Sequence, residues 1–153
     1  MALHRYRFRS TWVLPAPPDT VYALLAAADD YPDWWPQIRA TERTGPTSGN
    51  LRLRSFLPYD LRLTLRETRA DPHRRVLECA VEGDLEGWAR WTVEPRGPHG
   101  STARFRQEVE ARKPLLRRWA VPARPLFVAA HTWAMRGGRR GLRSRLEHRR
   151  REI

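Results

Sequence analysis

The chain has a single cysteine, Cys79, in 153 residues. An internal disulfide and a cysteine-rich metal site are therefore excluded. The five histidines show no paired spacing, and there is no HExxH or CxxC motif. A nucleophile elbow, a phosphate-binding glycine loop and a dinucleotide fingerprint are also missing from the sequence. We therefore expect neither a metal nor a cofactor.

Long apolar runs are missing as well. No segment approaches the roughly 20 apolar residues that a membrane-spanning helix needs. No apolar run follows the arginines of residues 1–10, so we do not expect a signal peptide. Together with the lone cysteine, this favours a cytoplasmic location. The length fits one domain, residues 1–153, with a core of its own, and leaves monomer and homodimer open.

Lysine is almost absent, yet the formal net charge is +12, because the chain contains 28 arginines. Residues 1–111 hold 16 basic against 15 acidic side chains, whereas residues 112–153 hold 13 against 2. The excess is either a solvated helix face or a contact surface for an anionic partner. No stacking aromatics are interleaved with the arginines, so we expect no specific nucleic-acid partner and only weak, salt-sensitive affinity for DNA.

Residues 124–149 are predicted to form a long amphipathic helix. At 100° per residue, one face is apolar or small and the other is basic. The first face contains Phe127, Ala130, His131, Ala134, Gly138, Gly141 and Leu142, and the second contains Arg136, Arg139, Arg140 and Arg143. The three glycines, which include Gly137, should each cost roughly 1 kcal/mol relative to alanine. A close approach to a sheet or to a bound molecule would offset that cost. The alternative is that Gly137-Gly138 kinks or ends the helix.

The rest of the chain is predicted to be mostly strands. Alternation with period two over His4–Leu14 marks a first strand with one buried face, and apolar residues at helical spacing follow over 18–28. A second short helix or turn is predicted over 33–36. Period two then returns in six further strands, at 38–43, 51–56, 61–66, 77–81, 88–93 and 103–109, with a turn over 45–50 and a proline-broken segment over 112–125. These elements predict an α+β fold with a curved antiparallel sheet of about seven strands packed on the last helix.

Four segments carry a resemblance to a known family. They are Pro17-Pro-Asp-Thr-Val-Tyr-Ala-Leu-Leu, Tyr31-Pro-Asp-Trp-Trp-Pro, Gly83-Asp-Leu-Glu-Gly and His131-x-x-x-Met135-x-x-Gly138-x-x-Gly141-Leu142. In this order the chain resembles the START-like (SRPBCC) superfamily, specifically its polyketide cyclase/dehydrase and lipid-transport group. The resemblance covers almost the whole chain. It implies a helix-grip fold with a mostly apolar cavity between sheet and helix, but no particular activity.

Large rings and small helix residues are the candidate ligand contacts. By alternation Trp12, Trp91 and Phe105 point inward, and on the helix Ala134 and Gly138 should leave room for a ligand. His131 is a polar residue on the apolar face: it is either a buried neutral histidine or a hydrogen-bonding group for a ligand. The candidate ligand-binding residues are Trp12, Trp35, Tyr59, Trp91, Phe105, Phe127, His131, Ala134, Met135 and Gly138. No catalytic residue is assigned, and His131 and Tyr59 are weak candidates for moving protons.

Three functions remain open at this point. The first is binding of a small hydrophobic or aromatic molecule in the cavity. The second is an aromatase/cyclase-type enzyme that closes a poly-β-ketone by aldol reaction and dehydration. The third is an interaction protein whose basic helix face engages an acidic partner or a membrane surface. Neither the ligand nor the presence of catalysis follows from the sequence.

Overall fold

A computed structural model describes residues 5–54, 60–112 and 124–152. The candidate Tyr59 and most of the proline-broken segment 112–125 lie outside these residues. The elements, in chain order, are β1 (Arg5–Leu14), α1 (Pro18–Ala26), the 3-10 turn η1 (Ala28–Asp30), α2 (Tyr31–Trp34), β2 (Ile38–Gly45), β3 (Ser48–Leu53), β4 (Leu61–Asp71), β5 (Val76–Gly83), β6 (Leu85–Arg96), β7 (Gly100–Ala111) and α4 (Arg124–Glu152).

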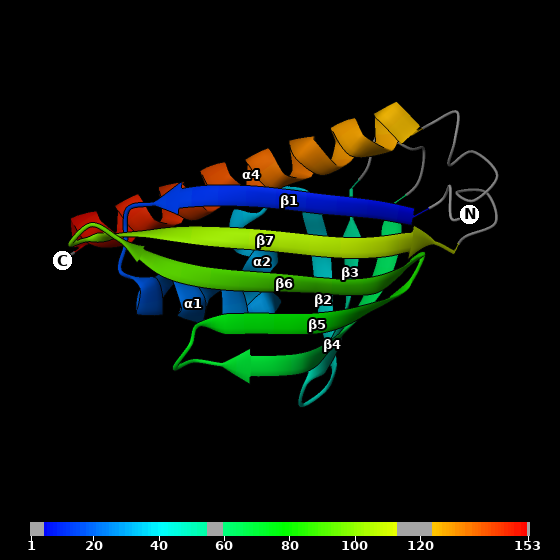
Figure 1. Cartoon of the computed structure of the whole chain (residues 1–153), viewed down its shortest axis with the longest axis horizontal. Helices are drawn as coiled ribbons and strands as arrows, with labels where there is room; N and C mark the ends of the chain where they lie inside the picture. Colours follow the sequence, from blue (N-terminus) through cyan, green and yellow to red (C-terminus); the bar gives the residue numbers. More distant parts are fainter. Residues whose placement is uncertain (1–4, 55–59, 113–123, 153) are drawn as a thin grey trace.

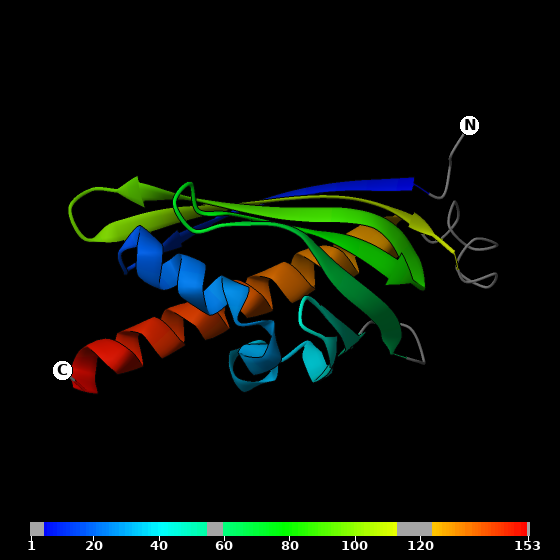
Figure 2. The same cartoon turned by 90° about the horizontal axis from the view of Figure 1, so that it is seen from below.

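The seven strands form one antiparallel sheet in the order β1-β7-β6-β5-β4-β3-β2. Strands β2 to β7 follow one another as a meander, and β1 pairs with β7, so that Arg5 lies opposite Glu110 and Leu14 opposite Ser101. The sheet curves, and α1, α2 and α4 all cover its concave face (Figures 1 and 2). The predicted helix-grip fold, with short helices after the first strand and a long helix at the end, is confirmed.

Strands differ from the prediction mainly at their ends. The turn predicted over 45–50 is shorter, because Gly45 already pairs with Ser48 and only Pro46 and Thr47 lie between them. Strands β4, β6 and β7 extend beyond the segments in which apolar and polar residues alternate. Cross-strand ion pairs continue the pairing there, as between Arg104 and Glu94, whose Nε and Oε2 atoms are 3.3 Å apart.

Helix α4 continues through all three glycines to Glu152, so the alternative that Gly137-Gly138 ends it is wrong. A Cβ atom at Gly141 would lie 1.5 Å from the carbonyl oxygen of Trp34. At Gly138 it would lie 2.5 Å from the ring of Trp35 and 2.7 Å from that of Trp12. The glycines therefore allow a close approach of α4 to the α2 segment and to two tryptophan rings.

Two apolar clusters lie between the sheet and the helices. The larger is built around aromatic rings: the centroids of Trp12 and Trp91 are 4.6 Å apart and those of Trp91 and Phe105 are 4.7 Å apart. It packs beneath α1, α2 and the middle and second half of α4, whose Met135, Leu142 and Leu146 are buried in it. The smaller cluster contains Tyr6, Leu51, Leu63, Val81 and Val109, with Phe127 of the first half of α4 packed against it.

Candidate functional site

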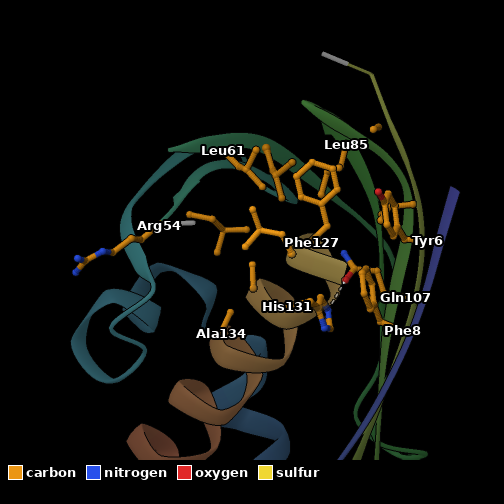
Figure 3. Close-up of a pocket in the computed structure, with 15 residues that line it drawn as sticks. Tyr6, Phe8, Arg54, Leu61, Leu85, Gln107, Phe127, His131 and Ala134 are labelled. Carbon is orange, nitrogen blue, oxygen red and sulfur yellow. Dashed lines mark hydrogen bonds between the residues drawn. The ribbon is translucent and has the colours of Figure 1, made fainter. Parts of the chain in front are cut away.

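A pocket of about 120 Å³ lies beside the smaller cluster, between the sheet and the first turns of α4 (Figure 3). Its wall is almost entirely apolar. Of the described lining residues only Arg54 and Leu126 are exposed, so the pocket borders solvent next to them. The lining residues are Tyr6, Phe8, Leu53, Arg54, Leu61, Leu63, Leu85, Gln107, Val109, Ala111, Leu126, Phe127, Ala130, His131 and Ala134.

The pocket follows from strand alternation and helix spacing. Residues Tyr6 and Phe8 share one face of β1. They lie opposite Val109 and Gln107 of β7, respectively, so four side chains form a floor on two neighbouring strands. The helix supplies side chains three and four residues apart, from Phe127 to Ala134, and two of them are alanines. Because Ala130 and Ala134 are short, the space between the helix and this floor is not filled by side chains.

His131 makes the polar contact inside this wall. Its Nε2 lies 3.1 Å from Oε1 of Gln107, and its ring stacks on that of Phe8 with centroids 3.6 Å apart and planes 4° apart. Burial lowers the pKa of His131 from 6.5 to about 4. The imidazole is therefore neutral at pH 7, with one ring nitrogen that donates and one that accepts a hydrogen bond.

The structure brings three of the ten candidate residues together at the pocket: Phe127, His131 and Ala134. Five others belong to the larger packed cluster and do not line this pocket, and these are Trp12, Trp35, Trp91, Phe105 and Met135. The expectation that Gly138 leaves free space is wrong, because the rings of Trp12 and Trp35 occupy that space. Trp35 is held there by its Nε1, which donates to the carbonyl oxygen of Ala134 at 2.8 Å.

Several lining residues were missed although the sequence contained a signal for them. The alternation that places Trp12 inward also places Tyr6 and Phe8 inward. On β7, Gln107 is the polar member of an inward row that includes Phe105 and Val109. A lone amide on an otherwise apolar strand face needs a partner, and His131 is that partner.

The described parts of the chain offer few other reactive groups. Burial raises the pKa of the Cys79 thiol to about 11, so little thiolate exists at neutral pH. Within residues 5–54, 60–112 and 124–152 there is no group of three or more His, Cys, Asp or Glu side chains placed to hold a metal ion. No helix in the same residues has the length and apolar character to cross a bilayer.

The outer face of α4 is basic, as its spacing predicted. Arg136, Arg139, Arg140 and Arg143 are all exposed. None of the four forms an ion pair with an acidic side chain of the described residues. Whether this face is merely solvated or meets an anionic partner stays open, and the absence of a specific nucleic-acid site stays a prediction.

Comparison with known proteins places the whole chain in one structural group. A family model described as polyketide cyclase / dehydrase and lipid transport matches residues 5–147. No curated protein matches by sequence. A Thermus thermophilus protein of solved structure is 19% identical, with 94% of this chain and 98% of that one covered and a TM-score of 0.80.

Two solved enzymes have the same fold. The Zhui aromatase/cyclase from Streptomyces sp. R1128 is 18% identical, with coverage of 95% of this chain and 96% of the enzyme and a TM-score of 0.77. A norcoclaurine synthase mutant from Thalictrum flavum, in complex with a transition state analogue, is 16% identical, with coverage of 95% and 96% and a TM-score of 0.66. At such identities the likeness establishes the fold alone.

Proposed function

Because the chain belongs to the polyketide cyclase / dehydrase and lipid transport family, we propose that it binds a small hydrophobic or aromatic molecule between the sheet and α4. The observation that carries this proposal is the pocket itself, an apolar space that contains one polar pair, His131 and Gln107. Apolar walls with few, convergent polar groups are typical of small-molecule sites.

The size of the pocket limits the ligand. A dry cavity of roughly 150 Å³ in another protein is large enough to bind benzene. A pocket of about 120 Å³ that is open at one side therefore suits a single aromatic ring or a short acyl chain. A multi-ring polyketide or a two-chain lipid would need side chains to move apart. The rings of Tyr6, Phe8 and Phe127 line the pocket and favour an aromatic ligand.

The proposed ligand contacts are Phe127, His131 and Ala134, together with the floor residues Tyr6 and Phe8. Of the other sequence candidates, Trp12, Trp35, Trp91, Phe105, Met135 and Gly138 support the pocket from the packed core, and Tyr59 lies outside the described residues. Because Nε2 of the neutral His131 donates to Oε1 of Gln107, Nδ1 is left as an acceptor for a ligand hydroxyl.

Filling the pocket should abolish uptake of a ligand. We expect Ala130→Leu to reduce binding of an apolar fluorescent probe at least tenfold, because the added carbons occupy the space above the floor. Ala129→Leu is the matched control, since Ala129 is the exposed neighbour on the same helix. Titration of the probe into wild type and both variants measures the effect. Equal uptake by all three proteins would exclude this pocket as the binding site.

Replacement of His131 should weaken binding of ligands that carry a hydroxyl group. We expect His131→Phe to reduce affinity for p-cresol by about three- to tenfold, because one hydrogen bond contributes roughly 0.5–1.5 kcal/mol. Affinity for toluene, which has the same ring and no hydroxyl, should change little. Calorimetric titration of both ligands into both proteins measures this difference. A parallel loss for toluene and p-cresol would show that His131 shapes the pocket without bonding to the ligand.

An aromatase/cyclase-type enzyme is the second candidate, favoured by the family and by the fold shared with an enzyme of that name. In that case His131 would be the proton carrier of the pocket. Its lowered pKa argues against this role, because an imidazole that titrates near 4 holds almost no proton at pH 7. The test is whether the purified protein converts a short poly-β-ketone and whether His131→Phe abolishes that conversion. Both results together would make the enzyme the first candidate function and ligand binding the second.

A further inference from the structure

Among the described residues that line the pocket, the charged one is Arg54, directly after β3. Its backbone is fixed, because its N–H donates to the carbonyl oxygen of Gln37 at 2.7 Å. Its guanidinium carbon lies 6.0 Å from the ring centroid of Trp133 on α4. Figure 3 shows the side chain extending away from the pocket, so the stem borders the opening and the charge lies at its rim.

The arginines near the end of β3 differ in their partners. Arg39 and Arg52 both bind the carboxylate of Asp60, at 3.2 and 3.4 Å. Arg54 has no ion pair with an acidic side chain of the described residues. Three arginines and one aspartate therefore lie near this end of β3, and the carboxylate of Asp60 is already shared by Arg39 and Arg52. The local charge next to Arg54 is net positive.

None of the described lining residues is acidic, and His131 is neutral, so no charge among these residues repels an anion. Resting on the proposed function, we infer that the ligand is an amphipathic carboxylate. Its ring or short chain lies on the floor of Tyr6 and Phe8, and its carboxylate binds the guanidinium of Arg54 at the rim. A planar guanidinium is the side chain best matched to a carboxylate, and Trp133 stabilises it in place.

Three compounds with one common tail test this inference: 3-phenylpropanoate, 3-phenylpropanol and 3-phenylpropylamine. We expect wild type to bind the carboxylate about three- to tenfold more tightly than the alcohol and the amine least tightly. Arg54→Met keeps the aliphatic stem and removes the charge, so the preference for the carboxylate should disappear while affinity for the alcohol stays the same. Raising the salt concentration should reduce the preference in wild type alone.

Arg52→Met is the matched control, because it removes one charge two residues before Arg54, on β3, where Arg52 binds Asp60. It should keep the preference for the carboxylate. If wild type binds none of the three compounds, the pocket proposal itself fails. If the alcohol binds as tightly as the carboxylate, or if Arg54→Met and Arg52→Met lose the preference equally, the inference is overturned while the pocket proposal stands.

Discussion

Gly141→Ala is expected to destabilise the fold by about 3 kcal/mol or more, although alanine is the better helix former. Helix propensity alone would stabilise the variant by roughly 1 kcal/mol. The new Cβ, however, would lie 1.5 Å from the carbonyl oxygen of Trp34 and 2.7 Å from the carbonyl carbon. Both atoms belong to backbone, so α4 and α2 would have to move apart, and the packed tryptophans between them would lose contacts. The steric term therefore exceeds the propensity term.

Urea denaturation of wild type and Gly141→Ala measures this loss as a lower free energy of unfolding. Ser144→Ala serves as the control, because Ser144 is exposed on the next turn of the same helix. It should be neutral or slightly stabilising. A Gly141→Ala protein as stable as wild type would mean that α4 does not approach Trp34 as closely as described.

Lowering the pH from 7 to 4 should cost the protein about 3 kcal/mol through His131 alone. In the unfolded chain the imidazole titrates near 6.5, whereas burial lowers the pKa of His131 in the folded protein to about 4. Between these values the unfolded state binds a proton that the folded state does not. The free energy of unfolding attributable to this group therefore falls as the pH drops through this window, and it levels off below about 4.

Carboxylates also titrate in this range, so the measurement compares wild type with His131→Gln. The glutamine has no charge to gain and can still bond to Gln107. We expect the stability difference between the two proteins to shift in favour of the variant as the pH falls from 7 to 4. Parallel pH profiles would contradict the burial of His131. Loss of ligand over the same pH range is a second readout, since a charged imidazole would disrupt an apolar wall.

Local patterns predicted the elements and their inward faces well. Alternation in β1 identified the shared face of Tyr6, Phe8 and Trp12, and helical spacing put Phe127 and His131 on one side of α4. Both signals depend only on residues close in sequence, where geometry is fixed by the period of the element. The order of elements then determined the sheet, because short turns leave few alternatives to a meander.

The position of the cavity could not be predicted in the same way. Both Phe8 and Trp12 face inward from β1, yet only Phe8 meets empty space. The difference arises from the contact of Gly141 with Trp34, which are 107 residues apart and set how closely the second half of α4 approaches its neighbours. A glycine on a helix face indicates that another group approaches the helix closely. The sequence does not show whether this group is a bound ligand or a side chain such as tryptophan.

The position of α4 at the end of the element order also has a consequence for synthesis. β1 can pair only with β7, whose residues are made about a hundred positions later, and α4 follows both. At roughly 5–20 residues per second, a ribosome needs roughly 1.5–6 s to make the 29 residues of α4. During those seconds the inner face of the sheet, including Trp12, Trp91 and Phe105, lacks the part of its cover that α4 provides. Until α4 has been made, the nascent chain therefore exposes apolar surface that the folded protein buries, and the speed at which the arginine-rich residues of α4 are decoded affects how long this exposure lasts.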